Sequence, residues 1–286
     1  MGYYMRDEVR REIVDYSKGR WMALEAPYGG GRLFIRYDRG VPLSVSSDSD
    51  YISLFERFSR FSFRTIYATA NVYRDITADG LRDESNVLRV TPVFDVDASL
   101  EDWRITLKAA EEIVRALERH GVVKSVYLKW SGRGLHVHIN ENAFSEEVLQ
   151  RYGPVTVARA VVDLIISEVS EKVTQLSRSA RNADRELRVE NRMDIQRVFT
   201  VPLSLHRFRR GQAAEGYRGS WKVPDNGTTS GSQVLSSEGR PEQGQVLRAQ
   251  QGNILCLGQI LRARQEGRSQ GIHLRAEGGG SEQGDF

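Results

Sequence analysis

Strand-like and helix-like segments alternate along this chain, which predicts a mixed α/β fold. The strands are marked by apolar, β-branched and aromatic runs such as residues 93–96 and 122–130, and the helices by apolar residues at helical spacing, as in residues 99–120. Acidic residues inside one strand and a Gly-flanked turn between two others mark a candidate site. Alternation alone allows either a parallel or an antiparallel sheet.

The amino-terminal part of the chain predicts two helices and two strands. Apolar side chains recur at helical spacing in residues 6–18 and 50–64, whereas residues 32–37 and 64–73 read as strands. A glycine run at residues 29–31 precedes the first of these strands. Because the run lacks the spacing of nucleotide-binding fingerprints, we expect a hairpin turn there rather than a phosphate-binding loop.

Asp95 and Asp97 are the unusual feature of the strand at residues 93–97. Residues two apart in a strand point to the same face, so these carboxylates project about 6–7 Å apart along the strand. Buried without a counter-charge, they would repel each other. A divalent cation such as Mg²⁺, which prefers oxygen ligands, would offset that repulsion. The alternative is that both side chains line the solvent face of an edge strand.

Two long helices are expected after this strand. The helix at residues 99–120 has Ser99 as its expected N-cap, and acidic residues follow in its first turn. The helix at residues 144–171 is expected to break or kink at the Gly-Pro pair of residues 153–154. A polar, arginine-rich connection is expected over residues 174–190.

A second informative stretch runs from Ser131 to His138, where one strand ends in a Gly-flanked turn and another begins. The polar groups that converge on this turn are suited to binding a triphosphate. They are backbone amides, the Ser131 hydroxyl, the Arg133 guanidinium and the His136 imidazole. His136 and His138 share one strand face and can also ligate a metal such as zinc, although no third ligand is evident nearby. We interpret His138 as an ordinary strand histidine.

A third informative stretch begins at Asp194, which precedes a short apolar strand that ends at Pro202. Its carboxy-terminal side is polar and basic and holds Ser204, His206, Arg207, Arg209 and Arg210. Taken alone, such an aspartate is usually a capping residue, and such a basic cluster is usually solvated surface.

Together, the three stretches resemble the archaeo-eukaryotic primase superfamily, and most closely the small, catalytic subunit of archaeal DNA primase. The strand with Asp-x-Asp at residues 95–97 is similar to the family's first motif, and the turn at residues 131–136 to its second. In the third motif an aspartate is followed eight residues on by proline and twelve on by histidine, as Asp194, Pro202 and His206 are here.

This resemblance implies a DNA primase, an enzyme that synthesises short RNA or DNA primers on a single-stranded DNA template by two-metal nucleotidyl transfer. It implies that Asp95, Asp97 and Asp194 are catalytic and hold two Mg²⁺ or Mn²⁺ ions. The residues that would bind the incoming nucleoside triphosphate are Ser131, Arg133, His136 and His206. A template strand would lie along the basic cluster of Arg207, Arg209 and Arg210.

The resemblance also implies a central, largely antiparallel sheet that carries all three motifs and is flanked by helices. The implied partner is a primase large subunit, in a heterodimer that serves DNA replication. The chain also departs from the family's pattern, and its second motif is one residue shorter than the common form. Only 33 residues, none of them cysteine, separate Asp97 from Ser131, so no zinc module is expected, and Phe208 stands where a lysine is usual.

Three other functions are compatible with parts of this pattern. A related primase-polymerase would extend existing 3′ ends in repair or in mobile-element replication. A catalytically inactive nucleic-acid-binding partner would keep the basic surface without turnover. A metal-dependent glycosyltransferase also uses Asp-x-Asp, but it does not explain the second and third stretches.

Composition sets the remaining expectations. The 286 residues suffice for one large domain or two small ones, and 28% charged with 40% hydrophobic residues is ordinary for a soluble globular protein. The net charge of +3, the isoelectric point of about 9.0 and the abundance of arginine favour an anionic partner. Cys256 is the only cysteine, which excludes a disulfide within the chain and a Cys-rich zinc module.

We expect a primase-like catalytic domain over residues 1–222. Residues 223–286 contain no lysine and are rich in Gly, Gln, Ser and Arg, so we expect disorder there, with one loose helix around residues 254–265. No apolar run is long enough to span a bilayer and no signal peptide is recognisable, so an intracellular location is expected.

Overall fold

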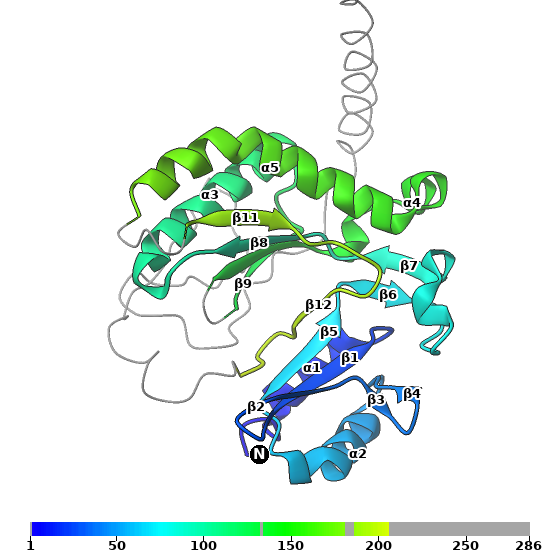
Figure 1. The fold of residues 1–286 in the computed structure, drawn as a ribbon. Helices are drawn as coiled ribbons and strands as arrows, with labels where there is room; N and C mark the ends of the chain where they lie inside the picture. The colour runs from blue at the N-terminus through cyan, green and yellow to red at the C-terminus, as the bar shows by residue number, and fades with distance from the viewer. Residues whose placement is uncertain (1, 132–133, 181–185, 206–286) are drawn as a thin grey trace, which may run out of the picture.

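The computed structural model describes residues 2–131, 134–180 and 186–205, and it is a mixed α/β fold in which all strand pairs are antiparallel (Figure 1). The predicted fold class is therefore confirmed. The α-helices are α1 (Asp7–Ser17), α2 (Asp48–Phe58), α3 (Trp103–Arg119), α4 (Glu146–Tyr152) and α5 (Pro154–Arg178). Short 3₁₀ helices are η1 (Ser59–Phe61), η2 (Gly80–Arg82), η3 (Glu84–Asn86), η4 (Leu100–Asp102) and η5 (Glu141–Ala143).

Within the described residues, the strands form two four-stranded sheets and two hairpins rather than one central sheet. The sheet that we call the β1 sheet has the order β12 (Val198–Thr200), β5 (Thr65–Thr69), β1 (Met22–Tyr28), β2 (Gly31–Ile35). The β8 sheet has the order β11 (Arg188–Asn191), β8 (Val93–Asp97), β10 (Leu135–Ile139), β9 (Val126–Trp130). The hairpins pair β3 (Tyr37–Asp38) with β4 (Val41–Pro42), and β6 (Asn71–Tyr73) with β7 (Val87–Val90).

Helices α3 and α5 cover one face of the β8 sheet, as Figure 1 shows. Phe94 and Val96 of β8 and Val137 of β10 are fully buried in the core beneath these helices. Because side chains alternate along a strand, the odd-numbered residues of β8, including both aspartates, point to the opposite face. We call this opposite face the carboxylate face.

A second core lies between the β1 sheet and helices α1 and α2. Leu24 of β1 and Ile66 of β5 are completely buried there, together with Ile13 of α1 and Leu54 of α2. Each sheet therefore has its own helical cover, and the two sheets meet through β12 and the start of β1. Helices α1 and α2 begin with acidic residues in the first turn, which the helix dipole favours.

Several predicted local features are confirmed. The glycine run at residues 29–31 forms the β1–β2 hairpin turn, where Gly29 and Gly30 adopt φ angles of 51° and 81°. The break at residues 153–154 separates α4 from α5, with Gly153 at φ 79° and proline at the first position of α5. In the described ranges, no helix has the length and apolar character needed to cross a membrane.

Two helix predictions were wrong in detail. Helix α3 begins only at Trp103, because the 3₁₀ helix η4 occupies the three residues before it. The Ser99 hydroxyl donates to the Asp102 carboxylate at 2.9 Å instead of capping backbone amides. Helix α5 continues to Arg178, beyond the expected end, because Val173 and Leu176 still pack against the core while polar residues face solvent. The expected tail and its loose helix lie outside the described residues.

Candidate active site

A row of polar residues, one from each strand, crosses the carboxylate face of the β8 sheet. Glu190 of β11 is in register with Asp95 of β8, Asp95 with His136 of β10, and His136 with Lys129 of β9. Cross-strand partners point to the same face, so these four side chains form a continuous line. The alternation of β8 adds Asp97 on the same face.

Asp95 lies at the middle of this row, and only 9% of its side chain is exposed. The two carboxylate oxygens of Asp95 have different partners: Oδ1 lies 3.2 Å from His136 Nε2, and Oδ2 lies 3.2 Å from Arg192 Nε. Burial alone would raise the pKa of Asp95. The hydrogen bond and charge of His136, together with the charges of Arg192 and Arg197, outweigh burial and lower that pKa. Asp95 is therefore ionised at neutral pH.

The turn of the second motif lies directly against the second aspartate. A Cβ atom added to Gly134 would lie 2.2 Å from the Val96 carbonyl oxygen and 2.5 Å from Asp97 Oδ1. The Ser131 amide donates to the Gly134 carbonyl at 2.9 Å, and the Ser131 hydroxyl accepts from the Gly134 amide at 3.2 Å. Glycine at position 134 is thus required for the turn to approach Asp97.

Gly134→Ala is expected to destabilise the fold and to displace Asp97. Since one clash is with backbone, we expect a loss of about 2 kcal/mol or more in the free energy of unfolding. Urea denaturation followed by circular dichroism would measure it. Gly31→Ala is the matched control, because its added Cβ has only an ordinary contact of 3.6 Å. Equal midpoints for the two variants would show that the close approach at Gly134 is not required.

The structure does not bring Asp194 into the row with Asp95 and Asp97. Asp194 lies in the loop between β11 and β12, not on a strand, and its side chain is exposed. Its Oδ1 accepts from the Gln196 amide at 2.7 Å, which is the ordinary turn-capping role of an aspartate. The role of Asp194 as a metal ligand stays a prediction.

Glu190 is an acidic residue beside Asp95 that was not among the predicted site residues. It was missed because the short strand β11 carries no strong strand pattern, and because only the pairing of β11 with β8 places Glu190 opposite Asp95. The one sequence signal is the alternation of charged and apolar residues in Arg188-Val189-Glu190.

The third motif reaches the site through β12. The Phe199 ring stands edge-to-face with His136, with ring centroids 5.2 Å apart, and the Arg197 guanidinium is close enough to lower the pKa of Asp95. Five of the predicted site residues fall outside the described ranges. They are Arg133, His206, Arg207, Arg209 and Arg210.

The donor chemistry on the carboxylate face fits a hard divalent cation. Asp95, Asp97 and Glu190 supply carboxylate oxygens, the ligands that Mg²⁺ and Mn²⁺ prefer. As the side chains stand, however, the described residues contain no group of three or more His, Cys, Asp or Glu residues arranged to hold a metal ion. The oxygens of Asp95 are held by His136 and Arg192 instead.

His138 and Lys129 form the buried end of the carboxylate face. His138 is fully buried and stacks on Tyr127, with ring centroids 4.7 Å apart. Burial, and then the charges of Lys129, His136 and Arg20, lower the pKa of His138 well below its usual value, so the ring is neutral. Both ring nitrogens lack a hydrogen-bond partner within the described residues. This environment agrees with the interpretation of His138 as a core histidine.

Lys129 joins the two sheets at this end of the row. Its side chain is 1% exposed, and its ammonium group donates to the Thr200 carbonyl of β12. Burial, reinforced by the charge of Arg20, lowers the pKa of Lys129 to about 7, although Asp95 acts in the opposite direction. The sequence offered no sign that this lysine is buried.

Lys129→Met is expected to change how stability depends on pH. At pH values below 7 the lysine is protonated in both folded and unfolded chains, and the folded state bears the cost of a buried charge. Between about pH 7 and 10.5 the unfolded chain binds the additional proton, so wild-type stability gains about 2 kcal/mol from pH 7 to 9 through this residue. The variant lacks this gain. Thermal unfolding at pH 7 and pH 9 would measure this gain, and Lys108→Met, at an exposed position, is the control. The prediction would be contradicted if the stability of wild type and of Lys129→Met changed equally between the two pH values.

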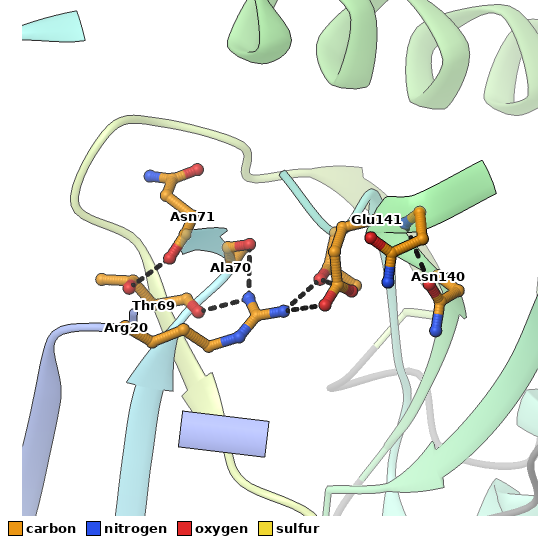
Figure 2. Close-up of polar contacts among 8 residues, drawn as sticks. Arg20, Thr69, Ala70, Asn71, Asn140 and Glu141 are labelled. Carbon is orange, nitrogen blue, oxygen red and sulfur yellow. Dashed lines mark hydrogen bonds and ion pairs between the residues drawn. The ribbon is translucent and has the colours of Figure 1, made fainter. Parts of the chain in front are cut away.

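A buried arginine ties the β1 sheet to the segments that flank β8 and β10. Figure 2 shows Arg20 between the strand end at Thr69 and Ala70 on one side and Glu141 on the other. Its guanidinium donates to the Thr69 and Ala70 carbonyls at 3.0 and 2.7 Å, and it lies 2.8 Å from the Glu141 carboxylate. Thr91, in the short link between β7 and β8, bridges Arg20 and Glu141 through its hydroxyl. This cluster therefore joins the end of β5 in the β1 sheet to Glu141, which follows β10 of the β8 sheet.

Comparisons with known proteins find a likeness in structure but none in sequence. No protein-family model matches the chain, and no curated protein matches its sequence. Among solved structures, the polymerase domain of ligase D from Mycobacterium tuberculosis, determined in complex with DNA, is similar to this chain with a TM-score of 0.47 and 12% sequence identity. The matched region covers 72% of this chain and 75% of that one.

Proposed function

We propose that this chain is a template-directed nucleotidyltransferase of the primase type, which makes short primers from nucleoside triphosphates on single-stranded DNA. One observation supports this proposal above the others: residues from separate motifs meet on one sheet face. Asp95 contacts His136, and Gly134 of the second motif packs against Asp97. A glycosyltransferase or a solvated edge strand would not require that convergence.

Each side chain has a distinct part in the proposed reaction. Asp95, Asp97 and Glu190 form the acidic side of the site, and a divalent ion bound there would supply activation of the attacking hydroxyl and charge neutralisation for the triphosphate. His136 Nε2 holds Asp95 in place. His136 Nδ1 is buried and has no hydrogen-bond partner in the described part of the chain, which leaves a polar atom for a ligand.

The turn at residues 131–134 is the proposed site for the triphosphate, because hydroxyl and backbone amide groups of a tight turn bind anions. Arg133 and His206 are proposed phosphate contacts, and Asp194 a further acidic residue. Arg207, Arg209 and Arg210 are proposed to contact the template backbone. A primase large subunit is the proposed partner, and an intracellular location is part of the same proposal.

The test is a primer-synthesis assay with the full chain, unprimed single-stranded DNA, labelled nucleoside triphosphates and Mn²⁺ or Mg²⁺. Dinucleotides and longer products are the expected result. Products formed only when a 3′ end is supplied would favour the related repair polymerase. DNA binding without turnover, unchanged in Asp97→Asn, would favour an inactive binding partner. Absence of product with and without a large subunit would overturn the proposal.

A further inference from the structure

The guanidinium of Arg192 contacts both Asp95 and Glu190 of the acidic site. Its Nε lies 3.2 Å from Asp95 Oδ2 and donates to Glu190 Oε2 at 3.0 Å, and its Nη2 forms an ion pair with the same Glu190 oxygen. We propose that Arg192 is a built-in counter-ion of this site, which a divalent cation must displace from Asp95 and Glu190. The inference rests on the proposed function, because it concerns the same carboxylates.

The electrostatic surroundings of Arg192 support this role. Arg192 donates two hydrogen bonds to the Glu190 carboxylate, from Nε at 3.0 Å and from Nη2, and its Nε is also within ion-pair distance of Asp95. The carboxylates that would attract a divalent ion thus already stabilise one cation. Because like charges repel, a metal ion and the guanidinium compete for the same oxygens.

The geometry permits Arg192 to leave without unfolding the strand. The residues on either side are fixed to α5: the Asn191 side chain donates to Asp163 at 2.6 Å, and Arg159 donates to the Met193 carbonyl at 2.8 Å. Arg192 itself is 39% exposed, in contrast to the 9% of Asp95. Rotation of one side chain toward solvent is therefore sufficient to free Asp95 Oδ2 and Glu190 Oε2, the two oxygens that Arg192 contacts.

Displacement also links metal binding to nucleotide binding. Once released, the guanidinium needs new anionic partners, and the phosphates of a nucleoside triphosphate are bidentate acceptors of the kind that arginine prefers. Metal and triphosphate should then strengthen each other's binding by the same factor, as linkage requires. Arg192 would thereby favour loading of the metal together with the nucleotide over loading of the metal alone.

Direct titration of the full chain with Mn²⁺ alone, by calorimetry or by the electron paramagnetic resonance of free Mn²⁺, tests this inference without turnover. Arg192→Gln is expected to bind Mn²⁺ about three- to tenfold more tightly than wild type, since it removes the competing ion pair. Arg192→Lys keeps the charge but not the planar guanidinium, so its Mn²⁺ affinity should lie between those of wild type and Arg192→Gln. The matched control is Arg115→Gln, which removes an arginine paired with Glu112 on α3. Its Mn²⁺ affinity should equal that of wild type.

A second readout compares Mn²⁺ binding with and without a non-hydrolysable triphosphate. The triphosphate should improve Mn²⁺ affinity more in wild type than in Arg192→Gln. If wild type binds Mn²⁺ and Asp95→Asn does not, yet Arg192→Gln binds no more tightly than wild type, the counter-ion role is overturned while the proposed function stands. If neither wild type nor Arg192→Gln shows Mn²⁺ binding that depends on Asp95, both proposals are overturned.

Discussion

Asp95→Asn is expected to reduce nucleotide incorporation at least about a hundredfold. Loss of a residue that only orients a metal ligand already costs about 10- to 100-fold, and Asp95 is proposed to be a ligand itself. Asparagine keeps the size of the side chain but removes the charge that pairs with His136 and Arg192. The primer-synthesis assay measures the loss, and Asp7→Asn, an exposed surface change on α1, is the control.

The same substitution has a predicted pH signature in stability. The pKa of Asp95 is lowered in the folded chain, so its ionisation stabilises the fold above the usual carboxyl range, and this contribution is lost as pH falls through the folded-state pKa. Asp95→Asn should therefore be less stable than wild type at neutral pH, and the difference should shrink in acid.

For the activity prediction, an Asp95→Asn variant that retained more than a tenth of wild-type nucleotide incorporation would contradict the proposed role of Asp95.

Arg20→Met should have the largest effect on stability. Arg20 is 1% exposed, and its removal leaves the Glu141 carboxylate and the Thr69 and Ala70 carbonyls without their shared donor. Breaking a buried ion pair from one side costs about 3–5 kcal/mol. Equilibrium urea denaturation would show a lower midpoint. Primer synthesis should fall as well, because the Arg20 cluster in Figure 2 joins the end of β5 to Glu141, which follows β10 of the β8 sheet.

The double variant Arg20→Met with Glu141→Gln separates the charge from the packing. Neutralising Glu141 removes the uncompensated buried charge, so the double variant should be more stable than Arg20→Met alone. The difference between the double variant and the sum of the singles gives the coupling between the two residues. Strictly additive effects would show that the pair does not act as a unit.

The fold class and the location of the site could be predicted because they depend on local patterns. Apolar spacing predicted α1, α2 and the main part of α3, and the Gly-Pro pair predicted the break between α4 and α5. The boundaries were less predictable. Whether a polar segment continues a helix depends on the few side chains that still reach the core, as Val173 and Leu176 do at the end of α5.

The division into two sheets was not predictable from local patterns. Residues 64–73 read as one strand, but β5 ends at Thr69 and β6 begins at Asn71 because each pairs with a different neighbour. A change of hydrogen-bonding partner leaves no mark on the alternation of side chains. The strands on either side of Asp194 are divided in the same way, because β11 belongs to the β8 sheet and β12 to the β1 sheet.

By itself, the sequence determined that Asp95 and Asp97 share a strand face and that His136 begins the strand after a glycine turn, because a period of two follows from the backbone of a single strand. Only the tertiary structure decided which residues stand beside them. Strand pairing places Glu190 opposite Asp95, brings Arg192 between the two and buries Lys129, while Asp194 is left at the loop surface. These neighbours are distant in sequence, and their meeting depends on the register of the sheet, which no local pattern encodes.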